Sequence, residues 1–208
     1  MRRNWHKKLF AWLLNKGETF DKKLAPFKKQ LFSDFTGKKI LEIGAGAGLN
    51  LKYYRDAEVI YLLEPNQHAH PYILQRNKIY KLNIQIIKDF AEAIPLPDNS
   101  VDAVISTFVL CSVESISKTL KEAARVLKPE GHFLFLEHVM AERGVTEVLQ
   151  KIFRAPWKCI ADGCDCCRDT QSLIKKSGIF SKVDSEIICK VPSVFLSPWL
   201  LGMAQKDN

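Results

Sequence analysis

The architecture of this chain follows from one short run, Ile40-Leu41-Glu42-Ile43-Gly44-Ala45-Gly46-Ala47-Gly48. Apolar residues at 39–43 predict a buried parallel strand, which runs into three alternating glycines and a helix-compatible segment at about 49–55. Glycine accepts positive φ angles and lets the backbone approach a ligand closely. A strand, a glycine turn and a helix start therefore predict a nucleotide-type site. The dinucleotide pattern G-x-G-x-x-G fails, because Leu49 stands at its third glycine position.

An acidic residue follows the next expected strand. Residues 58–63 are apolar enough for a strand, and Glu64-Pro65 comes directly after them. A ribose-binding carboxylate lies about 20 positions beyond the glycine turn in a β-α-β unit. Glu64 lies at that distance from Gly44, and its carboxylate can accept both ribose hydroxyls. The alternative is a solvated charge at a strand end.

The rest of the chain alternates helical and strand patterns. We expect helices at 4–15, 19–34, 68–80, 114–127, 144–160 and 168–177, strands at 84–88, 103–107 and 132–137, and two strands within 179–204. This order predicts a single-domain α/β protein with a doubly wound, Rossmann-like, mostly parallel seven-stranded sheet and an antiparallel C-terminal edge strand. We expect residues 1–36 to form an N-terminal helical leader or cap and residues 37–208 to form the domain.

Composition excludes several classes of protein. With 47% hydrophobic and 26% charged residues, the chain of 208 residues is typical of a soluble globular domain. Much of the net charge of +8 lies before residue 40, so the charge belongs to the leader more than to the domain. No apolar run approaches the roughly 18 residues of a membrane span. Six cysteines without a cleavable signal predict reduced thiols and a cytoplasmic location.

Three motifs together resemble the class I methyltransferases that use S-adenosylmethionine. Glu-x-Gly-x-Gly-x-Gly at 42–48 is similar to their motif I, residues 89–102 to their adenine-side loop, and Arg125-Val126-Leu127-Lys128-Pro129-x-Gly131 to the element before their fifth strand. The resemblance implies S-adenosylmethionine as cofactor. It places at the cofactor Glu42, Gly44, Ala45, Gly46, Gly48, Asn50, Glu64, Pro65, Asp89, Phe90, Ala91, Glu92, Thr107 and Val109.

The adenine-side loop departs from the pattern at one position. Phe90 stands directly before Ala91-Glu92, where an acidic residue is usual, and Asp89 lies one place earlier. Three ways to hold the adenine amino group therefore stay open: the Asp89 carboxylate, backbone carbonyls, or packing of the base on Phe90.

Further sequence segments resemble those of a narrower group, the methyltransferase-like 7 family of thiol S-methyltransferases. They are Val109-Leu110-Cys111-Ser112-Val113, Glu137-His138-Val139, and Ala155-Pro156-Trp157 leading to Asp162-Gly163-Cys164. The resemblance implies methylation of a small, apolar thiol. N- or O-methylation of a small molecule or lipid head group, arsenite methylation, and a non-enzymatic role at membranes or lipid droplets are the alternatives.

The residues after the fifth expected strand are candidates for the acceptor side. His138 lies at a strand end, where doubly wound sheets bind ligands, and we predict that it is the base or positions the thiolate. Asp162 is the second catalytic candidate. The predicted acceptor-side residues are Leu110, Cys111, Glu137, Trp157 and Cys164. A satisfied strand-end histidine and a loop-capping aspartate are the structural alternatives.

Cysteines gather at Cys159, Cys164, Cys166 and Cys167. A structural zinc site usually takes ligands from two short spaced pairs, and no matching second pair is present. Cys111 and Cys189 are not visibly placed to complete a site for arsenite. We therefore expect no metal, and small reduced residues beside the acceptor.

The leader begins with a basic amphipathic helix. Trp5, Leu9, Trp12 and Leu13 share one face. Such a helix can lie in a membrane interface or pack on its own domain over the cofactor, and both interpretations stay open. Relatives in the narrower family carry a longer apolar anchor. We expect a monomer with a small-molecule acceptor, peripheral membrane contact through residues 1–16 as the open alternative, and no nucleic-acid partner, because no base-flipping motif follows the fourth strand.

Overall fold

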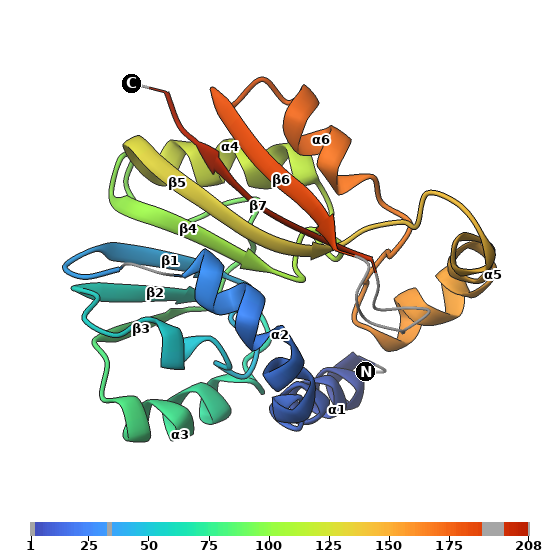
Figure 1. Cartoon of the computed structure of the whole chain (residues 1–208). Helices are drawn as coiled ribbons and strands as arrows, with labels where there is room; N and C mark the ends of the chain where they lie inside the picture. The colour runs from blue at the N-terminus through green and yellow to red at the C-terminus, as the bar shows by residue number, and fades with distance from the viewer. Residues whose placement is uncertain (1–2, 33–34, 189–197, 208) are drawn as a thin grey trace.

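Seven strands form one sheet in the order β3-β2-β1-β4-β5-β7-β6 (Figure 1). The computed structural model describes residues 3–32, 35–188 and 198–207. The strands are β1 (Lys39–Ile43), β2 (Val59–Leu63), β3 (Ile84–Ile87), β4 (Val101–Thr107), β5 (Leu127–His138), β6 (Lys182–Ile188) and β7 (Trp199–Gln205). The first five pair in parallel, whereas β7 is antiparallel to both β5 and β6. The predicted doubly wound sheet is confirmed.

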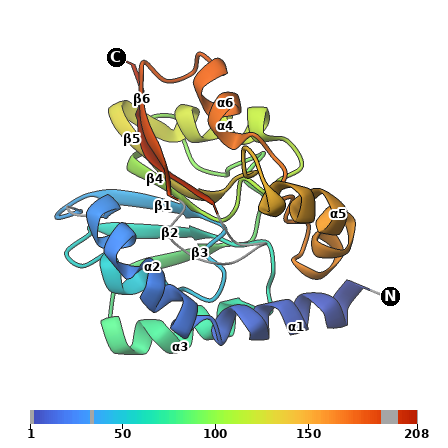
Figure 2. The same cartoon turned by 45° about the vertical axis from the view of Figure 1, so that its right-hand side comes forward.

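Helices cover both faces of this sheet (Figure 2). They are α1 (Arg3–Asn15), α2 (Glu18–Leu31), α3 (His70–Tyr80), α4 (Ile116–Val126), α5 (Val145–Ile160) and α6 (Thr170–Lys176). One hydrophobic core lies between the sheet and the helices α4 and α6. Separate clusters lie on the opposite face, under α2 and α3. Alternate residues of each strand supply them: Leu41 and Ile43 face α4, and Ile40 faces α3.

The segment after the glycines differs from the expectation. It forms only a 3₁₀ turn, Leu51–Tyr53, in place of a helix at 49–55. Leu51 and Tyr54 are both fully buried. The Asn50 side chain is also drawn inward, to Glu42 and Lys28. This inward pull on successive residues explains why the segment turns instead of continuing as an amphipathic helix.

β7 lies inside the sheet, and the edge strand is β6. Gly202 allows this insertion, because a Cβ there would lie 2.5 Å from the Asp184 carbonyl oxygen and 2.6 Å from the Phe135 ring. The register sets Trp199 opposite His138, at the end of β5. The last strand in chain order thus supports the strand that carries the predicted acceptor side. No described helix is long and apolar enough to cross a membrane.

Candidate active site

The glycine turn joins β1 to the 3₁₀ turn. Gly44, Gly46 and Gly48 have φ angles of 65°, 53° and 76°, a region that strongly favours glycine. A Cβ on Gly44 would lie 2.4 Å from Cγ2 of Val109, which follows β4. The Val109 side chain therefore lies closer to the Gly44 backbone than any residue with a Cβ would allow.

Glu64 directly follows β2 and lies beside this turn. Its Oε2 accepts a hydrogen bond from the Gly46 N–H at 2.7 Å, and its Oε1 accepts one from the Asn66 N–H at 2.8 Å. Burial raises the pKa of Glu64, while the two backbone donors oppose the rise. The carboxylate is thus fixed next to the glycine backbone. Asn66, itself buried, was missed in the sequence because a polar residue in a loop carries no pattern.

A buried polar network supports the turn from α2. The Lys28 ammonium donates to Asp21 Oδ1 and to Asn50 Oδ1, both at 2.6 Å. The Asn50 amide then donates to Glu42 Oε1 at 2.7 Å and to Thr107 Oγ1 at 3.1 Å. Burial raises the pKa of Glu42 to about 7. The structure thus brings together Glu42 and Asn50, two of the residues predicted at the cofactor. Both side chains are buried beneath the glycine turn.

The predicted adenine-side residues separate into different roles. Asp89 accepts a hydrogen bond from the Phe90 N–H at 2.8 Å, and the Phe90 ring is 59% exposed. Glu92 points away toward α4, where its Oε1 accepts from the N–H groups of Glu114 and Ser115. The carboxylate of Glu92 therefore anchors the start of α4.

Glu137 has a positioning role at the end of β5. It is fully buried and bonded to the Ser106 hydroxyl, and its carboxylate oxygens accept from the N–H groups of Val109 and Leu110 at 3.1 Å. Burial raises its pKa to about 7. Glu137 thus holds the loop after β4, in which Val109 contacts the glycine turn.

His138, Cys111 and Cys164 form one buried group. The His138 Nδ1 lies 3.6 Å from the Cys164 Sγ and 3.8 Å from the Cys111 Sγ. Its ring stacks on Phe108 with centroids 4.1 Å apart, and its Nε2 has no hydrogen-bond partner among the described residues. The hydrogen bond from Cys111 lowers the pKa of Cys164 to about 5, and that of Cys111 rises.

The segment after α5 (residues 161–169), which we call the strap, brings Cys164 next to Cys111. The Asp165 N–H donates to the Cys111 carbonyl at 2.9 Å, and the Arg168 guanidinium donates to the Leu110 carbonyl at 2.7 Å. Arg154 of α5 forms a bidentate pair with Asp165 at 2.6 and 2.9 Å. The sequence-based expectation that Cys111 stands apart from the cysteine cluster is therefore wrong.

Two other predicted residues come from α5 and the segment after it: Trp157, predicted on the acceptor side, and Asp162, the second catalytic candidate. Trp157 of α5 is half-buried, and a hydrogen bond from its indole helps to lower the pKa of Cys164. Asp162 lies toward the cofactor side: its charge raises the pKa of Glu64, and its Oδ1 is 3.9 Å from the His6 Nδ1 of α1.

α1 lies across the cofactor side of the site. The Asn66 amide donates to the Lys7 carbonyl at 2.9 Å, and Arg76 of α3 donates to both Asn15 and the Ala47 carbonyl. These contacts support the interpretation that the leader helix packs on its own domain. Its opposite face is exposed.

Comparisons with known proteins give the same class of fold. Residues 41–135 match the family model described as a methyltransferase domain. By structure, the chain is similar to the YcgJ protein of Bacillus subtilis (TM-score 0.66, 14% identity, 88% of this chain and 99% of that chain). It is also similar to a phosphoethanolamine N-methyltransferase of Haemonchus contortus (TM-score 0.71, 15% identity, 90% and 53%). The fold and the glycine turn are those of a class I, S-adenosylmethionine-dependent methyltransferase.

Sequence relatives narrow the assignment. The chain is 34% identical to thiol S-methyltransferase TMT1B of Rattus norvegicus over 176 residues, which are 79% of this chain and 72% of that protein. It is 30% identical to thiol S-methyltransferase TMT1A of Homo sapiens over 199 residues, which are 90% and 81%. The chain belongs to the methyltransferase family that includes these two proteins.

Proposed function

We propose that this protein transfers the methyl group of S-adenosylmethionine to the sulfur of a small, apolar thiol. The observation that carries this proposal is the membership in a family whose matched relatives are named thiol S-methyltransferases. The environment of His138 supports it, because the sulfur atoms of Cys111 and Cys164 and the face of the Phe108 ring lie around the imidazole at the end of β5.

The chain offers a fitting site for the cofactor. Glu64 is the residue we assign to the ribose hydroxyls, since its carboxylate directly follows β2 and is held beside the glycine turn by the Gly46 N–H. Gly46 and Gly48 are assigned to the methionine and ribose portion, and Asp89 and Phe90 to the adenine. When bound, the cofactor supplies a methyl group on a positively charged sulfur.

The protein's part in the reaction is alignment and deprotonation. Transfer from a sulfonium is an in-line displacement, so nucleophile, methyl carbon and departing sulfur must be collinear. The reaction neutralises the donor's charge, and no oxyanion hole is needed. A thiol must become a thiolate, and its ordinary pKa is about 8.5. His138 is our candidate to position that thiolate, with Asp162 as a second candidate nearer the cofactor.

A matched set of acceptors tests the proposal. Purified protein is incubated with tritium-methyl S-adenosylmethionine and benzyl mercaptan, benzylamine, phenol or arsenite. We expect transfer to the thiol at least about tenfold above the others, because it is apolar and forms its thiolate more readily than phenol forms phenolate, whereas the amine is mostly protonated near neutral pH. The Glu64→Gln protein is the control for cofactor-dependent transfer. Turnover of the amine, phenol or arsenite with none of the thiol would overturn the thiol assignment and leave the methyltransferase class intact.

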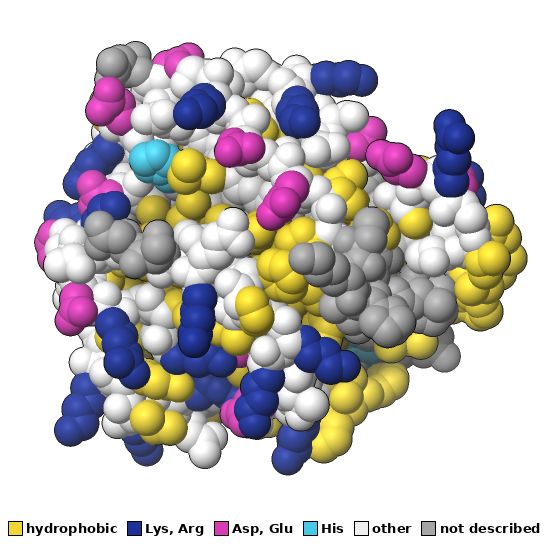
Figure 3. Space-filling view, viewed as in Figure 1, with side chains coloured by type: hydrophobic (Ala, Val, Ile, Leu, Met, Phe, Trp, Pro, Cys, Tyr) yellow, Lys and Arg dark blue, Asp and Glu magenta, His cyan; other side chains and the backbone are white. Residues whose placement is uncertain are grey.

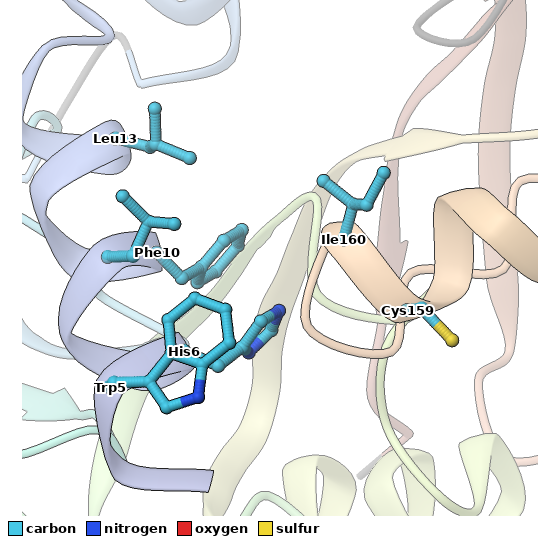
Figure 4. Close-up of a pocket in the computed structure, with 7 residues that line it drawn as sticks. Trp5, His6, Phe10, Leu13, Cys159 and Ile160 are labelled. Carbon is cyan, nitrogen blue, oxygen red and sulfur yellow. The ribbon is translucent and has the colours of Figure 1, made fainter. Parts of the chain in front are cut away.

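We also propose that the outer faces of α1 and α5 meet a membrane surface, an anionic one because α1 carries Lys7 and Lys8. Trp5 and Trp12 of α1 are 64% and 47% exposed, and Ile152 and Ile160 of α5 are 63% and 62% exposed. Figure 3 shows apolar side chains gathered at the right edge, over α5, and at the lower right, over α1. A cavity of about 150 Å³ separates the helices, lined by Trp5, His6, Leu9, Phe10, Leu13, Cys159 and Ile160 (Figure 4).

Sedimentation with phosphatidylcholine–phosphatidylserine vesicles tests this contact. The Trp5→Ser/Trp12→Ser protein should bind at least about tenfold more weakly than wild type, because interfacial binding scales with buried apolar area. Ile79→Ser is the matched control, since Ile79 is 73% exposed but lies on α3. Equal binding by the two variants, or no binding by wild type, would contradict the proposal.

A further inference from the structure

Three potential metal ligands converge behind the acceptor side. The ligating atoms of Cys111, His138 and Cys164 all lie within 4.8 Å of one another, and each residue is buried. They come from three separate parts of the chain: the loop after β4, the end of β5 and the strap after α5. The hydrogen bonds from Asp165 and Arg168 to the loop after β4 hold the strap in the position that makes this convergence possible.

The spacing of these atoms fits a tetrahedral zinc ion. With zinc–sulfur bonds of about 2.3 Å and zinc–nitrogen bonds of about 2.05 Å, tetrahedral angles place a sulfur and a nitrogen ligand about 3.5 Å apart. The His138 Nδ1 lies 3.6 Å from the Cys164 Sγ and 3.8 Å from the Cys111 Sγ. An ion could therefore bind with only small shifts of these side chains.

Charge and chemistry point in the same direction. Thiolate and imidazole ligands are those that select zinc over hard cations such as Mg²⁺. Two thiolates and one neutral imidazole would balance the charge of Zn²⁺, so the site could stay buried without an uncompensated charge. Catalytic zinc sites combine three protein ligands, in some proteins two cysteines and one histidine, with an open fourth position.

We propose that Cys111, His138 and Cys164 bind one zinc ion, whose fourth position accepts an exogenous thiolate. Both cysteines would bind the ion as thiolates, so any proton still on a cysteine thiol leaves for solvent, and binding an acceptor releases the proton of its thiol. The sulfur–zinc bond would then hold the acceptor as a thiolate at the end of β5. Only this use of the fourth position rests on the proposed thiol methylation; the metal site itself does not.

Cobalt substitution tests the site without any methyl transfer. The full chain is purified under reducing conditions, its zinc content is measured, and Co²⁺ is then titrated into the metal-free protein. We expect about one equivalent of bound zinc and, with Co²⁺, thiolate-to-cobalt charge transfer with intense visible bands of tetrahedral geometry. Absence of bound zinc together with absence of these bands would overturn the site, whatever the acceptor assay shows.

Variants assign the ligands. Cys111→Ser, Cys164→Ser and His138→Asn should each lose or strongly weaken the cobalt bands. Cys166→Ser is the matched control, because Cys166 is equally buried and lies in the same strap but outside the group. Cys189→Ser, at a position outside the described residues, should also keep the bands. Retention of the bands in all three ligand variants, or their loss in Cys166→Ser or Cys189→Ser with the fold intact, would contradict the ligand set.

The fourth position has its own measurement. Adding 2-mercaptoethanol to the cobalt protein should shift and intensify the charge-transfer bands, because a third thiolate enters the coordination sphere. An unchanged spectrum at saturating thiol would show a closed site and overturn the acceptor-binding part of the proposal. Failure of the proposed function looks different: no methyl transfer, with the cobalt spectra as expected.

Discussion

Replacing Glu64 with glutamine is expected to weaken S-adenosylmethionine binding about a hundredfold. The change removes a charged acceptor from the position assigned to the ribose hydroxyls. Hydrogen bonds to charged groups contribute roughly 1.5–3 kcal/mol each, and about 2.7 kcal/mol corresponds to a hundredfold change in Kd. Isothermal titration calorimetry with S-adenosylmethionine measures the effect directly. The substitution is nearly isosteric, so the fold should be kept.

Glu58→Gln provides the matched control for this measurement. Glu58 directly precedes β2 and its side chain is 55% exposed, whereas Glu64 directly follows the strand and is buried. The Kd of the Glu58 variant should stay within about twofold of wild type, as is usual for surface substitutions. A Glu64→Gln protein that unfolds like wild type and binds the cofactor within threefold of the wild-type Kd would contradict the assignment of Glu64 to the ribose.

Gly44→Ala is expected to destabilise the protein by about 3 kcal/mol and to abolish measurable cofactor binding. The left-handed backbone at φ 65° costs a non-glycine residue roughly 1–2 kcal/mol, and overpacking costs roughly another 1–3 kcal/mol. The new methyl group would stand 2.4 Å from Val109 Cγ2 and push the loops apart where the ligand belongs. Urea unfolding measures the first effect and calorimetry the second.

Two further variants separate strain from collision. Gly37 has the same φ of 65°, but a Cβ there meets nothing within 4 Å, so Gly37→Ala should cost only the strain, about 1 kcal/mol. Adding Val109→Ala to Gly44→Ala should recover part of the lost stability, since it removes the colliding methyl groups. If Gly37→Ala costs as much as Gly44→Ala, the close approach to Val109 is not what requires glycine.

The parts of the molecule that the sequence predicts well are set by local spacing. Gly44 and Glu64 occupy consecutive strand ends of one β-α-β unit, so their proximity follows from the topology. The contacts of Glu64 with the Gly46 and Asn66 N–H groups are local as well. The doubly wound, mostly parallel sheet was predictable for the same reason, because short connections leave few arrangements of a parallel sheet.

Features that depend on distant packing could not be predicted in this way. Cys111 and Cys164 belong to different loops, and only the strap after α5 brings them together. Glu137 lies in a strand buried on both faces, so alternation gives no sign that its carboxylate faces Val109 rather than an acceptor. Lys28 sits in a basic pair typical of a solvated surface, yet it is only 3% exposed.

The place of β7 inside the sheet has a consequence for how the molecule is made. Until residues 199–205 have been synthesised, β5 presents an unpaired edge that ends in Glu137 and His138. The glycine turn and Glu64 belong to strands that can already pair by then. During biosynthesis the strands that lead to the glycine turn and Glu64 can therefore pair first. The end of β5 that carries Glu137 and His138 gains its second neighbouring strand only after β7 has been synthesised.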